Sequence, residues 1–383
     1  MNPITRRSSL KRMAFAVGAS TLQFGLRQWS TIAAEAEGEA KPTAAESAKL
    51  AEIGREFLES TKAAGLSVAI ARHGQLVYAE AFGLADKAAS EKVTPEHLFR
   101  ICSVTKPITS AAVFLLVEQG KLKLDDFVFG RKGMLGAAFS DVYHSFLDQV
   151  TIHHLLTHTA GGWSNHENDP MFTHPQMNHH ELIAWTLKNR PLENAPGTHY
   201  AYSNFGYCLL GRVLENAAGK PYEEFVRANI LAKCGIQNMR IAGNTLAERA
   251  PKEVVYYTQQ GEDAYGMNVR RMDSHGGWIA TPSDIVKFAC HVDGLDAREN
   301  ILTPQSIKLM TTATSANPGY ASGWLVNSVP NWWHDGNLPG SVSLVVRTAR
   351  GLCWAAFANM RGPGMDLDGM MWKMAKAVPS WKA

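Results

Sequence analysis

The sequence predicts an α/β fold (α+β sandwich), in which an antiparallel sheet is flanked by helices and carries an inserted all-helical subdomain. Strand patterns occur near both ends of the chain, and helical patterns fill its middle. Strands that are distant in sequence but not accompanied by alternating helices favour one antiparallel sheet over a parallel one. The 383 residues, 45% of them hydrophobic, are enough for one large core or two modest ones.

The strand predictions rest on alternation and on turn residues. Residues 65–86 alternate around His73-Gly74, which indicates two strands joined by a tight turn. Residues 341–348 and 351–360 form two further strand patterns with a turn between them. A Met- and Trp-rich amphipathic helix follows, and we expect its apolar face to pack on the sheet.

The helix predictions begin near residue 103, where an apolar run continues to Gly120. Glycine is a common helix stop, so one helix is expected over 103–119. From about 120 to 255 the pattern is mostly helical, and we place the helical subdomain at roughly 107–255.

The N-terminus differs from the rest of the chain. Arg6-Arg7 precede a short apolar stretch, and Ala34-Glu35-Ala36 offers a small-residue cleavage site. This order predicts a twin-arginine-type signal peptide over 1–36, export to the periplasm, and no membrane anchor after processing. A disordered tail is the alternative. A linker over 37–48 and a catalytic domain over 49–383 would follow.

Composition excludes several classes of partner and cofactor. The net charge is +3 with scattered basic residues, which gives no sign of a nucleic-acid surface. The five cysteines form no C-x-x-C motif, and we expect no disulfide. We predict no cofactor, and a small molecule or a peptide as the substrate; the oligomeric state stays open.

The first chemical signal is Ser103 and Lys106, which stand three positions apart at the start of the apolar helix. Residues i and i+3 face the same side of a helix, so the two side chains should lie together. They fit an activated nucleophile with its partner. A capping serine and a solvated lysine are the alternative, and Ser8 and Lys11 share the spacing without any such context.

Two more segments offer the groups that a serine nucleophile needs. Tyr202 and Asn204 precede an apolar helix, and a tyrosine with a depressed pKa can act as a base while an asparagine orients the lysine. Turn residues without chemistry are the alternative here. Two segments, His275-Gly276-Gly277 and His334-Asp335-Gly336, could form one wall of the site. We expect His334-Asp335-Gly336 to form it because this segment precedes a strand, whereas the other leads into a helix cap.

These motifs, taken in order, make the chain resemble the serine β-lactamase-related hydrolases from about residue 50 to the end. The resemblance rests on five segments: FRICSVTKPIT, VTIHHLLTHTAGG, PGTHYAYSNFGYCLLGRVLE, GGWIATPSDIVKF and WWHDGNLPGSVSLVVRT. It implies a β-lactamase/transpeptidase-like fold with the site between sheet and helices. It also implies Ser103 as the acylated nucleophile, Lys106 as its partner, Tyr202 as the base and Asn204 as an orienting residue.

His334 departs from this resemblance, because many relatives carry lysine where this chain has His334-Asp335-Gly336. An imidazole with an ordinary pKa is mostly neutral at pH 7.5 and holds a carboxylate weakly. Neutral esters or amides are therefore expected to be better substrates than β-lactams. The same reasoning predicts that carboxylate-bearing substrates improve as the pH falls from 8 to 6, because the histidine gains charge.

The remaining site predictions concern the oxyanion and the pocket. The backbone N–H groups of Ser103 and Asn337 are the expected oxyanion donors. Trp163, Trp332 and Trp333 are weaker candidates for the pocket wall. Seven of the fourteen histidines lie between residues 153 and 180, but no H-E-x-x-H spacing appears, and we predict no metal and a polar loop over the cleft.

The most economical function is a periplasmic serine hydrolase that cleaves an ester or an amide through a Ser103 acyl-enzyme. The alternatives are a penicillin-binding DD-peptidase or D-amidase, a class C-like β-lactamase, a non-catalytic receptor for cell-wall peptide, and a metal-dependent hydrolase that uses the histidine cluster.

Overall fold

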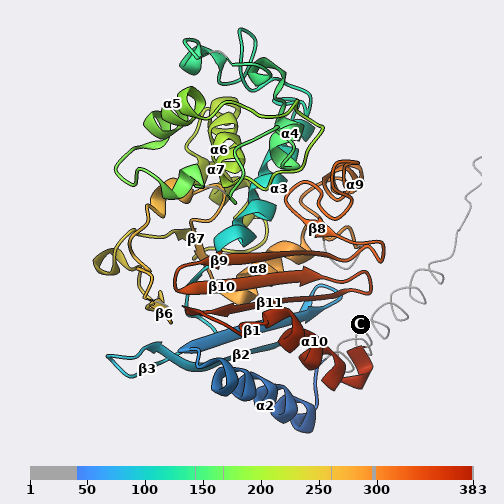
Figure 1. Ribbon diagram of the computed structural model, residues 1–383. Helices are drawn as coiled ribbons and strands as arrows, with labels where there is room; N and C mark the ends of the chain where they lie inside the picture. Colours follow the sequence, from blue (N-terminus) through green and yellow to red (C-terminus); the bar gives the residue numbers. More distant parts are fainter. Residues whose placement is uncertain (1–40, 143, 167, 260, 296–298, 382–383) are drawn as a thin grey trace, which may run out of the picture. The chain divides into compact units, whose positions relative to one another are not determined.

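The computed structural model describes residues 41–381 except 143, 167, 260 and 296–298 (Figure 1). The predicted signal peptide over 1–36 lies outside the described residues. The linker predicted over 37–48 is wrong at its end, because helix α2 spans Ala44–Thr61. Thr43 caps this helix, and Glu46 completes a capping box by accepting the Thr43 N–H at 2.7 Å.

A seven-stranded antiparallel sheet forms the centre of the described chain, in the order β3-β2-β1-β11-β10-β9-β8. This arrangement confirms the predicted fold class. The strands are β1 (Gly65–Arg72), β2 (Gln75–Asp86), β3 (Glu91–Lys92), β8 (Leu325–Val326), β9 (Trp332–Leu338), β10 (Ser341–Arg347) and β11 (Leu352–Ala358).

The hairpin of β1 and β2 turns at His73-Gly74, as predicted. Both residues have positive φ, 45° and 75°. Positive φ at the two central positions matches the twist of the adjoining strands and favours glycine at the second position. The first and last parts of the chain then meet in the sheet, because β1 pairs with β11.

Helices cover both faces of the sheet. Trp354 of β11 makes an edge-on contact with Trp372 of α10 (Leu367–Ala377), with ring centroids 4.8 Å apart. Its neighbour Cys353 points to the other face and hydrogen-bonds Cys290 of α8 (Pro282–Cys290). Successive strand residues face opposite sides, so α10 and α8 cover opposite faces. Helix α2 packs beside α10, and the amphipathic last helix therefore packs on the sheet as predicted.

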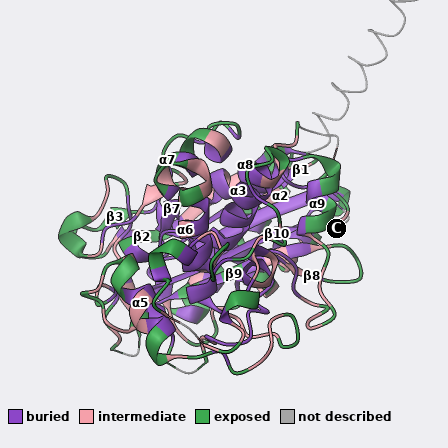
Figure 2. Ribbon diagram, turned by 90° about the horizontal axis from the view of Figure 1, so that it is seen from above, coloured by how far each residue is buried: buried purple, intermediate pink, exposed green. Residues whose placement is uncertain are grey.

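The predicted nucleophile helix is observed as a short 3-10 turn, Cys102–Val104, followed by α3 (Thr105–Glu118). Figure 2 shows α3 largely in the colour of buried residues. The other helices of the helical part, above the sheet in Figure 1, are α4 (Ile152–Leu156), α5 (His179–Asn189), α6 (Asn204–Ala218) and α7 (Tyr222–Val226).

The expectation of mostly helical structure over 120–255 is only partly right. Apart from residue 143, residues 120–151 form turns and two short 3-10 helices, with no α-helix. Gly219 ends α6 with φ 66°, a left-handed conformation that favours glycine.

Three short strands lie between the sheet and the helical part: β4 (Phe99–Arg100), β5 (Arg240–Ile241) and β7 (Trp278–Ala280). They pair in the order β4-β7-β5. The remaining elements are β6 (Tyr257–Thr258), which pairs with β12 (Met360–Arg361), and helix α9 (Pro304–Met310). No helix in the described part of the chain has both the length and the apolar character needed to cross a bilayer.

The centre of the sheet should dominate stability. Phe357 of β11 is fully buried and contacts Phe99 with ring centroids 6.2 Å apart. We predict that Phe357→Ala lowers the free energy of unfolding by about 3–5 kcal/mol, as large-to-small core substitutions do. Leu309→Ala is the control, because Leu309 is 44% exposed, and we expect a change below about 0.5 kcal/mol. Urea unfolding followed by tryptophan fluorescence measures both; equal effects would contradict the assignment of the core.

Candidate active site

Ser103 lies in a strained turn between β4 and α3. The preceding residue, Cys102, has φ 50°, which is rare for a side chain of this kind. Ser103 belongs to the single 3-10 turn that opens the helix. The first N–H groups of a helix lack partners within it, so the Ser103 N–H is available to an acceptor.

Strand β10 holds this turn through two hydroxyl groups. Ser341 Oγ donates to the Arg100 carbonyl at 2.8 Å, and Ser343 Oγ donates to the Ile101 carbonyl at 2.6 Å. All four residues are buried. Buried hydrogen bonds of this kind fix the backbone because leaving either partner unsatisfied is costly.

Gly336 of β9 lies where the sheet approaches the nucleophile turn most closely. A Cβ atom there would lie 2.2 Å from Ser343 Oγ, 2.6 Å from the Ile101 carbonyl oxygen and 2.8 Å from Cys102 Cβ. Glycine is therefore required by space and not by backbone angle. The role of Gly336 is to let β9 reach Ser103.

Lys106 is fully buried beside Ser103, with its amine held by three acceptors. Its Nζ donates to Ser103 Oγ at 3.0 Å, to Asn204 Oδ1 at 2.7 Å and to the His275 carbonyl at 3.2 Å. The spacing argument for Ser103 and Lys106 is thus confirmed as a contact. The sequence analysis treated His275 only as part of a turn and missed its carbonyl.

The orientation of Asn204 is fixed by its second partner. Asn204 Nδ2 donates to Asp169 Oδ2 at 2.7 Å, so its Oδ1 must face Lys106. Asp169 also accepts the Met171 N–H at 2.9 Å. Burial raises the pKa of Asp169, while these hydrogen bonds and Lys106 oppose the rise. The sequence analysis did not identify Asp169, because nothing marks it in a loop of polar residues.

Burial sets the protonation of Lys106 and Tyr202, the two side chains next to Ser103. It lowers the pKa of Lys106 to about 7, although Asp169 and Asp335 partly counteract it. Burial raises the pKa of Tyr202 well above its ordinary value, even though the Ser103 hydroxyl bonds the phenol. The expected depressed pKa of Tyr202 is therefore wrong. The lysine, and not the tyrosine, is the group that can exist as a free base near neutral pH.

His334 belongs to a buried chain of hydrogen bonds that fixes its protonation. Its Nδ1 lies 2.6 Å from the Asp335 carbonyl, which can only accept, so Nδ1 carries the proton. Its Nε2 then accepts from the Tyr320 hydroxyl at 3.2 Å. Both ring nitrogens of His334 are used inside the protein.

The same chain continues to His158 on the helical side. The Ser203 N–H donates to His158 Nδ1 at 3.1 Å, which leaves the proton on Nε2. Nε2 lies 3.1 Å from the Tyr320 hydroxyl and donates to it. Tyr320 therefore links both histidines. Neither His158 nor Tyr320 was singled out from the sequence; His158 lies in one of the quoted motifs, but Tyr320 has no local signal.

Burial and the nearby Lys106 lower the pKa of His334 to about 4, against a smaller upward effect of Asp335. This corrects the expectation of an ordinary imidazole. His334 gains no charge between pH 8 and 6, so the prediction that carboxylate substrates improve over that range is wrong. The expectation that the His334 side chain is uncharged at neutral pH agrees with this lowered pKa.

Asn337 faces the site with its backbone. In an antiparallel pair, opposite residues alternate between those that exchange hydrogen bonds and those that do not. Leu338 and Ser341 close the two-residue turn and form the first hydrogen-bonded pair. The next hydrogen-bonded pair is Gly336 with Ser343. Asn337 lies between these pairs, so its N–H points away from β10. Strand β8 pairs with β9 only at Trp332 and Trp333, so this N–H lies at an open edge, as an oxyanion donor requires.

A cavity of about 510 Å³ opens over Ser103. It is lined by Ser103, Asn165, Asp169, Phe172, Tyr200, Tyr202, Asn204, Tyr320, Leu325, His334, Asp335 and Asn337. The predicted loop over the cleft contributes Asn165, Asp169 and Phe172 to this wall.

None of the three predicted tryptophans lines this cavity. Trp163 is buried and donates to the Arg190 carbonyl at 2.9 Å, beside a separate depression. Trp332 packs under the Arg347 guanidinium, and Trp333 lies opposite Leu325 in the β8–β9 pair. Trp332 and Trp333 stand at the start of β9, before the part of the strand that reaches Ser103.

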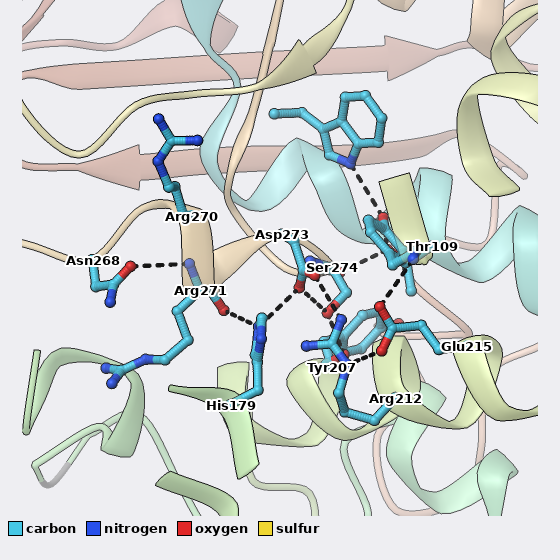
Figure 3. Close-up of polar contacts among 12 residues, drawn as sticks. Thr109, His179, Tyr207, Arg212, Glu215, Asn268, Arg270, Arg271, Asp273 and Ser274 are labelled. Atoms are coloured by element: carbon cyan, nitrogen blue, oxygen red, sulfur yellow. Dashed lines mark hydrogen bonds and ion pairs between the residues drawn. The ribbon is translucent and has the colours of Figure 1, made fainter. Parts of the chain in front are cut away.

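A charged network around Asp273 holds the segment that precedes His275 (Figure 3). Asp273 accepts from Arg212 at 2.6 Å and lies 3.5 Å from His179. Burial alone would raise the pKa of Asp273, but the Arg212 guanidinium and, after it, the hydrogen bond to His179 hold the pKa below its ordinary value. Ser274 Oγ also donates to the Tyr207 carbonyl, so α5 and α6 both anchor this segment.

Arg271, from the same segment, holds the loop that borders the cavity. Its guanidinium donates to four backbone carbonyls, those of Met171, Thr173, His174 and Met177. Two of the histidines there have structural partners: His174 packs against Trp185 with tilted rings, and His180 stacks on Phe139. Among the described residues, no three His, Cys, Asp or Glu side chains are grouped so that they would hold a metal ion.

The chain is similar to known hydrolases over most of its length. The chain matches the beta-lactamase family over residues 50–378. It is 30% identical over 287 residues to esterase EstB of Burkholderia gladioli, covering 71% of each chain. It is 24% identical to penicillin-binding protein 4* of Bacillus subtilis (strain 168), covering 73% of this chain and 64% of the relative.

A solved structure supports the fold. The D-amino acid amidase from Ochrobactrum anthropi SV3, complexed with L-phenylalanine amide, superposes with a TM-score of 0.70 at 22% identity, covering 88% of this chain and 100% of the amidase. The match over residues 50–378 and the 30% identity to esterase EstB place the protein in the beta-lactamase family of serine hydrolases.

Proposed function

We propose that the protein hydrolyses an ester or an amide through an acyl-enzyme on Ser103. The observation that carries the proposal is the contact of Ser103 Oγ with a buried Lys106 whose pKa lies near 7. A neutral amine has two N–H bonds and one lone pair. Asn204 Oδ1 and the His275 carbonyl occupy the two N–H bonds, so the lone pair is directed at the serine hydroxyl.

In the proposed acylation, Ser103 Oγ attacks the substrate carbonyl carbon and its proton passes to Lys106 Nζ. The developing oxyanion is stabilised by the N–H groups of Ser103 and Asn337. When the C–O or C–N bond breaks, the neutral Tyr202 hydroxyl protonates the leaving group, and Lys106 returns a proton to the tyrosinate. Water then attacks the acyl-enzyme by the same steps in reverse.

The cavity supports an esterase or amidase more than a β-lactamase or a DD-peptidase, because both of the latter act on substrates with a carboxylate. His334 is neutral and has no free ring nitrogen, so it offers no charge to such a group. Intact Ser103 and Lys106 also favour an enzyme over a receptor. A periplasmic location is part of the proposal and is supported by Arg6-Arg7 and the apolar stretch that follows.

The nucleophile is tested by covalent labelling. Wild-type protein should gain the mass of one fluorophosphonate adduct, and Ser103→Ala should gain none and lose turnover of a nitrophenyl ester. Ser60→Ala is the control, since Ser60 is exposed on α2 and does not line the cavity. Near wild-type ester hydrolysis by Ser103→Ala would contradict the proposal. A parallel incubation with a penicillin shows whether β-lactams also acylate the site.

The pH dependence tests Lys106 as the base. A lysine with its pKa lowered to about 7 is protonated and inactive as a base below that pH, and it becomes neutral above it. The kcat/KM of a neutral ester should therefore rise about tenfold from pH 6 to 8. Lys106→Arg, which stays charged, should lose at least about a hundredfold at every pH. A flat wild-type profile over this range would rule out this role for Lys106.

Tyr202 and Lys106 should act as one unit. We predict that Lys106→Ala and Tyr202→Phe each lower kcat at least about a hundredfold, the usual scale for acid–base catalysis. The double variant should be little worse than either single variant, because one proton path is broken in each. Losses that multiply fully would show that the two residues act independently.

A further inference from the structure

The charge of the cavity is unusually one-sided. The charged side chains that line it are the carboxylates of Asp169 and Asp335, with no lysine or arginine among the lining residues. The one histidine, His334, is held neutral by partners at both nitrogens. The residues that line the cavity therefore include two carboxyl side chains and no lysine or arginine.

The two carboxylates are not equivalent. Asp169 is 9% exposed and accepts from Asn204 and from the Met171 N–H, so its oxygens serve the structure around Lys106. Asp335 is exposed and lies on the open face of β9, opposite to the buried face that carries His334. Within the described residues, Asp335 forms no ion pair. It is the carboxylate that is free to meet a substrate.

Aromatic side chains line the same cavity. Tyr200 and Tyr320 lie with ring centroids 5.7 Å apart, and Phe172 is 45% exposed at the wall. Aromatic faces attract cations, and quaternary ammonium groups are commonly bound by aromatic walls. A carboxylate beside aromatic rings fits an ammonium group and repels a carboxylate.

We propose that this cavity selects ester or amide substrates that carry an ammonium group, and that Asp335 is the residue that determines this preference. The proposal rests on the proposed function, because it names the substrate class of the Ser103 site. The charge of Asp335 reaches the reacting groups: it contributes to the pKa values of both Lys106 and Tyr202. A cation that binds near Asp335 thus lies close to the nucleophile.

The experiment compares matched esters that differ only in charge. In the leaving-group series these are butyrylthiocholine, the thioester in which carbon replaces its nitrogen, and butyryl mercaptopropanoate, which carries a carboxylate. In the acyl series they are the nitrophenyl ester of trimethylammoniopentanoate and its carbon isostere. The two series are needed because the ammonium can enter on either side of the scissile bond. The quantity measured is the cation-to-neutral ratio of kcat/KM, which cancels any general effect of a variant on the catalytic groups.

In wild-type protein, the cationic ester should be preferred over its isostere in at least one series, and the carboxylate ester should be the poorest substrate. Asp335→Asn should lower the cation-to-neutral ratio at least about threefold, mainly through KM, as expected for a partly exposed charge pair. Raising the ionic strength from about 0.05 to about 0.5 M should lower the wild-type ratio as well, because salt screens exposed charges. The control is Asp125→Asn, an exposed carboxylate that does not line the cavity, and its ratio should equal that of wild type.

Two failures can be distinguished. In the first, the neutral esters are hydrolysed only when Ser103 is present, but the cation-to-neutral ratio is the same in wild type and Asp335→Asn in both series. The charge preference is then wrong, and the proposed function stands. If the neutral esters are not hydrolysed, or Ser103→Ala hydrolyses them equally well, the proposed function itself is wrong.

Discussion

The site depends on the burial of one lysine. Removing the Lys106 amine from water disfavours its charged form, and in the proposed mechanism this places a base beside the serine at neutral pH. Three acceptors hold the amine in place, and each comes from a different part of the chain: the 3-10 turn before α3, the start of α6 and the segment before β7. The helices, the sheet and the charged network around Asp273 all serve to keep these three acceptors together.

Much of the arrangement follows from local sequence. The i, i+3 spacing of Ser103 and Lys106 predicts their contact because helix geometry alone produces it. The hairpin at His73-Gly74 and the stop at Gly219 follow from the conformations that glycine allows. The Thr-x-x-Glu pattern at Thr43 also signals a helix start, and it explains why the catalytic domain begins before the linker was expected to end.

What could not be predicted depends on packing between distant segments. His158 lies 162 residues before Tyr320 in the sequence, and no periodicity connects it with Tyr320 and His334 before the chain folds. The pKa of His334 is set by burial, which a sequence pattern shows for a helix face but not for a single polar residue in a strand. The tryptophans next to His334 were misplaced for a related reason: alternation gives the face of a strand, but not the point along it at which the strand meets the nucleophile turn.

The pairing of α2 with α10 has a consequence for the chain as a whole. The first and last helices of the catalytic domain lie side by side against the sheet, on the side away from the helical part that borders the cavity (Figure 1). Both helices therefore lie away from the mouth of the cavity. Attachment to a support through either helix is compatible with an open site.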